Sequence, residues 1–128
     1  MIFFDYEQVV KIHSLLIAKT GGTDGVRDKN LLESALKTPF QTFDGSELYQ
    51  TILDKASQFC YSLIENHPFL DGNKRIGVHL TLLFLKLNGV ELSYSQNELI
   101  EFGLNIASGK VNKEDIKNWL HSHINLQA

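Results

Sequence analysis

The chain has 128 residues, 43% of them hydrophobic and 21% charged, and its formal net charge is −3. These values are ordinary for a globular protein, and we expect a single domain over residues 1–128. The slightly acidic balance argues against attraction of the whole chain to nucleic acid or to an anionic membrane.

One cysteine excludes a disulfide within the chain and suits a reducing compartment. The first residues, 1–5, carry no basic region of the kind that opens a signal peptide. The longest apolar stretch, around residues 80–87, is too short to cross a bilayer. We therefore expect a cytoplasmic protein with no membrane partner.

The first predicted helix begins after Asp5, because Gln8 stands three positions later and the two form a capping box. Apolar side chains follow at helical spacing, at Val9, Ile12 and Leu16. Glycines in residues 21–25 break the chain.

Asp28 caps a short predicted helix that runs through Lys37, and Pro39 ends it. Residues 38–43 are interpreted as an irregular loop, with a flap over the site as the alternative, and residues 44–46 form a turn.

A long helix is predicted from about Glu47 to Asn66, since its apolar positions alternate at intervals of three and four. Pro68 disfavours helical geometry at His67, so this helix stops just before the histidine. The next helix starts near Asn73 and ends at residues 88–89. It is apolar around most of its circumference, which is typical of a buried central helix.

Residues 90–94 are predicted to be extended, without a clear partner. Ser95 with Glu98 opens a helix that ends near residues 108–109, and Asn112 with Asp115 opens a last helix to about residue 124. The sequence thus predicts an all-α protein, a compact bundle of about six helices with a central buried helix.

The loop between the two central helices concentrates the chemistry of the chain. Gly72 permits a turn in which backbone N–H groups point inward, and the following helix N-terminus attracts anions. Lys74 and Arg75 add positive charge there, although cations at this end of a helix are otherwise unfavourable. Asp71 is a hard ligand suited to Mg²⁺, and His67 is a candidate general base. Phe69 is expected to turn inward and anchor the loop.

Residues 67–75 read His-Pro-Phe-Leu-Asp-Gly-Asn-Lys-Arg. This segment resembles the signature H-x-F-x-[D/E]-[A/G]-N-x-R of the Fic/Doc family, and residues 25–36 and 61–66 also look like that family. The resemblance implies the Fic fold. The short chain resembles the death-on-curing (Doc) branch, whose members are toxins of bacterial toxin–antitoxin pairs.

Two departures bear on the activity. Members that transfer adenylyl groups typically read H-x-F-x-[D/E]-G-N-G-R-x-x-R, whereas Lys74 and Val78 replace the second glycine and the last arginine here. Doc-type toxins share both changes. The resemblance implies that the γ-phosphate of ATP is attacked, so that the protein is a kinase of a translation elongation factor and inhibits protein synthesis. Adenylyl transfer stays the alternative.

Carried over by position, His67 would deprotonate the target hydroxyl and Asp71 would hold Mg²⁺. Gly72, Asn73 and Lys74 would form the loop that binds the phosphates of ATP, and Arg75 would contact phosphate oxygens. His79 follows Arg75 by four positions, so it either faces the active loop or simply packs.

The family's inhibitory motif, [S/T]-x-x-x-E-[G/N], is not completed in this chain, because Tyr61 precedes Glu65 by four positions. The resemblance therefore implies a separate antitoxin whose disordered tail folds into a groove and blocks the site. A further alternative is a protein without catalysis that bridges antitoxin dimers as a co-repressor. We expect no direct contact with nucleic acid and a monomer when the protein is free.

Overall fold

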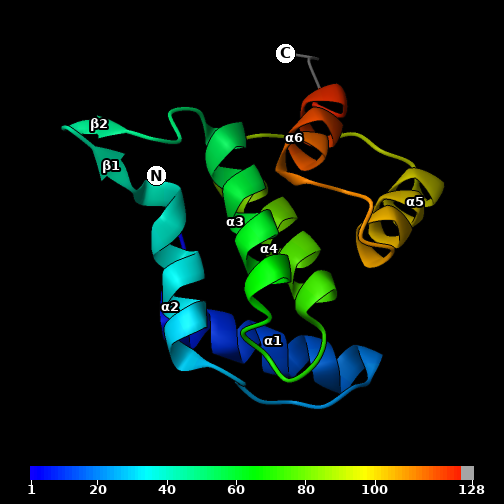
Figure 1. Ribbon diagram of the computed structural model, residues 1–128. Coiled ribbons are helices and arrows are strands. Elements are labelled where there is room, and N and C mark those ends of the chain that lie inside the picture. Colours follow the sequence, from blue (N-terminus) through cyan, green and yellow to red (C-terminus); the bar gives the residue numbers. More distant parts are fainter. Residues whose placement is uncertain (125–128) are drawn as a thin grey trace.

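The computed structural model describes residues 1–124, and residues 125–128 of the expected domain lie outside the described residues. Within that part the chain folds into six α-helices, a 3₁₀ turn and a small hairpin (Figure 1). The elements are α1 (Tyr6–Thr20), α2 (Lys29–Lys37), η1 (Thr38–Phe40), β1 (Thr42–Phe43), β2 (Ser46–Glu47), α3 (Ile52–Asn66), α4 (Asn73–Leu87), α5 (Gln96–Ala107) and α6 (Lys113–Ser122). The prediction of an all-α bundle is confirmed.

Most helices begin where a polar side chain accepts a hydrogen bond from the first turn. The capping boxes predicted at Asp5, Ser95 and Asn112 all form, and Asp28 accepts from the N–H of Leu31. Each such cap satisfies an otherwise unpaired N–H group and contributes about 1 kcal/mol to stability. Local sequence therefore fixes where these helices begin.

The predicted start of the long helix at Glu47 was wrong. Helix α3 begins at Ile52, where Thr51 and Asp54 form a further capping box. Glu47 instead lies in β2, where it pairs with Thr42 of β1. Extended pairing across the hairpin and a strong cap at Thr51 together place the helix start later in the chain.

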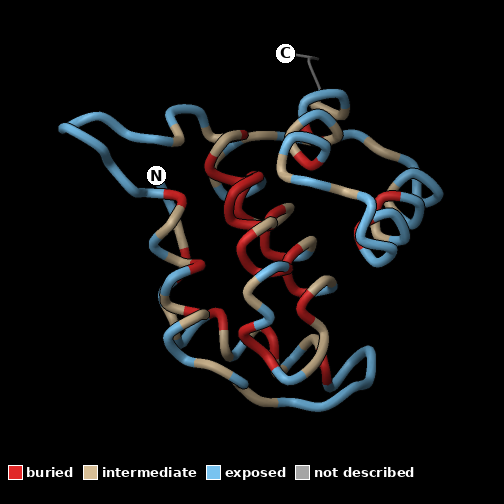
Figure 2. The backbone as a smooth tube through the Cα atoms, in the orientation of Figure 1, coloured by how far each residue is buried: buried red, intermediate tan, exposed pale blue. Residues whose placement is uncertain are grey.

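Helices α3 and α4 lie side by side in the middle of the bundle, and α1 passes behind the loop that joins them (Figure 1). The buried segments gather on these two helices, whereas α5 and the hairpin are mostly exposed (Figure 2). Helix α4 buries Ile76, Leu80 and Phe84 completely. The helix is central, but it is not buried around its whole circumference, because Leu87 is 43% exposed and Leu82 is only partly buried.

The two extended segments lie away from the loop between α3 and α4. The 90–94 segment has a partner after all, since Leu92 bridges Ile124 just beyond α6. The hairpin stands at the N-terminal end of α3, and the 15 residues of that helix separate it from His67 (Figure 1). At about 1.5 Å per residue this is roughly 20 Å, so residues 38–43 do not form a flap over the loop. Within residues 1–124, no helix combines the length and apolarity needed to span a bilayer.

Candidate active site

The loop between α3 and α4 carries the predicted site, and both of its ends adopt left-handed backbone conformations. His67 caps α3 with φ 47° and ψ 55°, and its side chain is exposed. Gly72 precedes α4 with φ 76° and ψ 20°, a conformation that glycine adopts without strain. The loop therefore turns sharply at each end and presents its residues at one end of the bundle.

Helix α4 begins without a side-chain cap, unlike the other five α-helices of residues 1–124. The first N–H groups of any helix have no partner within the helix and carry the positive end of its dipole. The N-terminus of α4 is thus available to an anion.

Two buried side chains hold the loop from inside. Asn73 accepts a hydrogen bond from the Phe69 N–H at 2.9 Å and donates one to the Phe69 carbonyl at 3.0 Å. Phe69 is 1% exposed, in agreement with the expected inward orientation. The Asn73 side chain is thus engaged with the loop itself, and only its backbone N–H remains for a phosphate.

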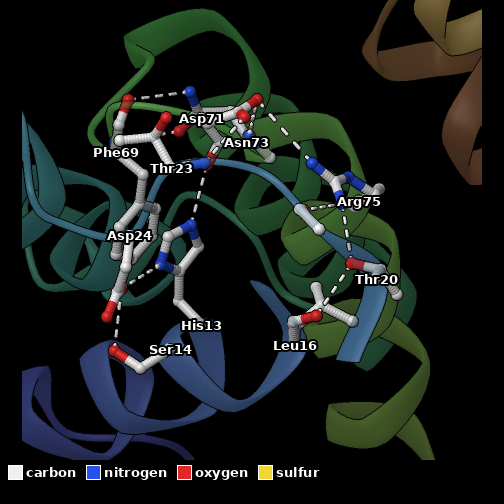
Figure 3. Close-up of polar contacts among 12 residues, drawn as sticks. His13, Ser14, Leu16, Thr20, Thr23, Asp24, Phe69, Asp71, Asn73 and Arg75 are labelled. Atoms are coloured by element: carbon white, nitrogen blue, oxygen red, sulfur yellow. Dashed lines mark hydrogen bonds and ion pairs between the residues drawn. The ribbon is translucent and has the colours of Figure 1, made fainter. Parts of the chain in front are cut away.

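Asp71 lies in the loop with both carboxylate oxygens bonded (Figure 3). Its Oδ2 accepts from the Thr23 N–H at 3.1 Å, and its Oδ1 accepts from the Gly72 N–H at 2.8 Å. These two N–H groups hold the pKa of the Asp71 carboxyl below its ordinary value, and the nearby Arg75 guanidinium adds to the effect. The side chain is therefore an oriented anion at neutral pH.

A single carboxylate fits Mg²⁺ bound together with a nucleotide. No group of three or more His, Cys, Asp or Glu side chains able to hold a metal occurs in residues 1–124. Mg²⁺ usually takes one or two carboxylates and completes its shell with phosphate oxygens and water. The Asp71 carboxylate is compatible with such a site, and its role as the Mg²⁺ ligand stays a prediction.

The two cations of the motif diverge. Arg75 donates from Nη1 to the Thr20 hydroxyl at 2.6 Å and to the Gly21 carbonyl at 2.8 Å, while its Nη2 lies 3.7 Å from Asp71 (Figure 3). Lys74 instead donates to the Ala107 carbonyl at the C-terminus of α5, at 3.0 Å. Arg75 thus stays beside the loop, whereas a role for the Lys74 ammonium in binding phosphates requires it to leave this bond.

Residues 22–28 form a strap that holds the loop from outside. The sequence indicated a chain break, a helix start and a family resemblance in this region, but it did not predict this contact. The Arg27 and Asp28 N–H groups both donate to the Pro68 carbonyl, and the Leu70 N–H donates to the Gly25 carbonyl. Val26 forms a bridge with Phe69. The strap therefore pairs with the loop much as a short strand would.

Arg27 reinforces this strap with its side chain. Its Nε donates to the His67 carbonyl at 2.6 Å and its Nη2 to the Asn66 carbonyl at 2.8 Å. The guanidinium group thus pairs two carbonyl groups at the end of α3 and fixes the backbone of His67. Arg27 lies 40 positions before His67, so no spacing rule relates the two residues.

An apolar groove of about 460 Å³ opens beside the cations, between α4 and α5. Its walls come from α1, α4 and α5, and include Leu16, Lys74, Arg75, Val78, His79 and Leu104. His79 thus faces the groove next to Arg75, and its side chain is exposed rather than packed in the core.

The family model and the relatives that this chain matches agree on one family. The family model described as "Fic/DOC family" matches residues 3–85. The chain is 37% identical over 91 residues to "Toxin Doc" of Mycolicibacterium smegmatis (strain ATCC 700084 / mc(2)155), which covers 71% of this chain and 68% of that relative. It is 25% identical over 114 residues to "Protein kinase doc" of Escherichia phage P1, which covers 89% of each chain.

Proposed function

This chain belongs to the Fic/DOC family, and from that premise we propose that it is the toxin of a toxin–antitoxin pair that phosphorylates a protein hydroxyl. The names of the two relatives, "Toxin Doc" and "Protein kinase doc", support the toxin and the kinase respectively. The observation that carries the proposal is the uncapped N-terminus of α4 beside Asp71 and Arg75, with the exposed His67 at the other end of the same loop.

In the proposed reaction, the N–H groups of the first turn of α4 receive the terminal phosphates of ATP. Arg75 would neutralise phosphate oxygens, and Asp71 would hold Mg²⁺, which would offset the negative charge of the phosphates. The hydroxyl oxygen of the target attacks the γ-phosphorus, His67 takes the hydroxyl proton, and ADP leaves. His67 suits this role because it is exposed, so that a protein target has access to it, and because Arg27 holds its backbone carbonyl.

The surroundings of α4 favour transfer of the γ-phosphoryl group over transfer of the adenylyl group. Val78 stands where family members that transfer adenylyl groups carry a second arginine, and it lines the apolar groove together with Leu82 and Leu104. At position 78 the groove therefore presents an apolar side chain instead of the second arginine of those members. Lys74 stands at the position of their second glycine, and its side chain donates to the Ala107 carbonyl of α5.

On the strength of the resemblance we propose a translation elongation factor as the target, and with it activity in the cytoplasm. The resemblance also gives an antitoxin as the partner. We assign the antitoxin segment to the groove between α4 and α5, with an apolar face against Leu82 and Leu104 and acidic side chains toward Lys74 and Arg75. A segment seated there would cover the cation that the phosphates need.

To test the proposal, the purified protein is incubated with a cell extract, Mg²⁺ and ATP labelled at either the γ- or the α-phosphate, and the label on protein is measured. Label transferred from the γ position alone supports the kinase, whereas label from the α position overturns it in favour of adenylyl transfer. His67→Ala should abolish transfer, and His121→Ala, an exposed histidine on α6, is the matched control that should not. Absence of label from either position would favour the co-repressor.

A further inference from the structure

A buried histidine of α1 contacts the active loop, and sequence reasoning passed over it. His13 is 1% exposed, and its Nε2 lies 2.7 Å from the carbonyl oxygen of Asp71 (Figure 3). Its ring also stacks on Phe69, with 3.8 Å between centroids and 8° between planes. His13 therefore touches the loop at the expected metal ligand and at its hydrophobic anchor.

Stability alone does not account for a histidine here. In residues 1–124, His13 Nδ1 is the buried side-chain polar atom without a hydrogen-bond partner. The carboxylate of Asp24 lies 3.5 Å away, and it already accepts from the Ser14 hydroxyl at 2.9 Å. Burying an unpaired nitrogen is unfavourable, so an aliphatic side chain would serve better if the position only filled space.

The contact with Asp71 fixes which ring nitrogen carries the proton. A carbonyl oxygen only accepts hydrogen bonds, so Nε2 of His13 must be protonated and donate. The Asp24 carboxylate lies on the other side of the ring, 3.5 Å from Nδ1, and makes no hydrogen bond to it.

The same contact sets the direction of the next N–H group. The peptide between Asp71 and Gly72 is planar and trans, so its C=O and N–H point in opposite directions. With the carbonyl held toward α1 by His13, the Gly72 N–H points away from α1, where it meets the Asp71 Oδ1 at 2.8 Å. Asp71 is thus held by its carbonyl on one side and by Thr23 and Gly72 at its carboxylate on the other.

We infer that His13 is a positioning residue of the active loop, which acts through the Asp71–Gly72 peptide and the Phe69 ring. This rests on the proposed function in that Asp71 would be the ligand for Mg²⁺, and the Gly72 N–H of the same peptide holds its carboxylate beside the first turn of α4. His13 itself touches neither ATP nor target, and it keeps the loop in the geometry that both require.

The variants separate positioning from mere packing. His13→Leu removes the donor, His13→Gln keeps an N–H at a similar reach, and Val9→Ala is the matched control, a fully buried change on the same helix. We expect His13→Leu to lower kcat for transfer about 10- to 100-fold and to raise the Mg²⁺ concentration for half-maximal rate. His13→Gln should recover much of the loss, and Val9→Ala should keep the wild-type kcat.

A readout independent of activity is the amide NMR spectrum of the full chain. The Gly72 and Thr23 signals should shift in His13→Leu and stay in place in Val9→Ala. Equal kcat in His13→Leu and Val9→Ala, with an unmoved Gly72 signal, would overturn the inference.

Failure of the proposed function and failure of the inference about His13 give different results. A wild-type protein that transfers no label defeats the proposed function, while the amide shifts still test His13. If His13→Leu does not fold, the ring nitrogens of the wild type decide, because an unprotonated Nε2 contradicts the donor role.

Discussion

Gly22 is the position where one added methyl group should most directly displace the active carboxylate. Its φ is +117°, and a Cβ atom there would lie 2.6 Å from the Asp71 Oδ2 and 3.1 Å from the Arg75 Nη2. The first distance is about 0.8 Å inside the 3.4 Å at which ordinary contact begins. Asp71 has a short side chain that the Thr23 and Gly72 N–H groups hold in place, so it cannot yield without breaking a bond.

Gly22→Ala should therefore have two separable effects. The backbone conformation costs the alanine about 1–3 kcal/mol of unfolding free energy. The displaced carboxylate should lower kcat/KM for phosphoryl transfer about 10- to 100-fold, since an error near 1 Å in a catalytic group costs up to that much.

The matched control is Gly45→Ala in the hairpin. Gly45 also has a positive φ, +80°, but an added Cβ would meet nothing within 4 Å. Urea unfolding should show a loss of stability in both variants, larger in Gly22→Ala, and label transfer from γ-labelled ATP should fall in Gly22→Ala alone. If Gly22→Ala keeps the wild-type kcat/KM and Mg²⁺ dependence, the placement of Asp71 is not what sets the rate.

Three further predictions concern stability. Asn73→Ala leaves the buried Phe69 N–H and carbonyl without partners. The free energy of unfolding in urea should therefore fall by about 1–3 kcal/mol per group. A fall well under about 1 kcal/mol would contradict the role of the Asn73 side chain in holding the loop. Phe69→Ala should cost about 3–5 kcal/mol in the same assay, and a near-neutral result would mean that the loop does not depend on its anchor. Burial lowers the pKa of His123, but its hydrogen bonds to the Trp119 carbonyl and the Glu98 carboxylate outweigh burial, so the pKa is raised overall. The pKa of Glu98 is lowered, because its carboxylate accepts from the Ser95 N–H and bonds to His123. Their pair, 2.5 Å apart, should stabilise the fold between pH of roughly 4.5 and 6.5, and the contribution should fade as pH rises through the pKa of His123 or falls through that of Glu98. Glu98→Gln should thus lower stability more at pH 5.5 than at pH 8.5, and an equal loss at both would refute the assignment.

The sequence by itself determined the features that depend on neighbouring residues. Capping boxes at Asp5, Ser95 and Asn112 mark helix starts because cap and partner lie three positions apart. Pro68 ends α3 before His67 because a proline acts on the residue directly preceding it. The box at Thr51 and Asp54 was equally visible in the sequence, and only the apolar pattern extended the expected helix back to Glu47.

The tertiary structure alone decided what holds the loop and where its side chains go. His13 meets Asp71 across 58 positions, and Arg27 meets His67 across 40, because α1 and the strap pack under a loop that the sequence places far away. Motif spacing identified Asn73 and Lys74, but their side chains bond to Phe69 and Ala107 in the fold. Hydrogen bonds of this kind follow from the packing of whole helices, which local propensity does not encode.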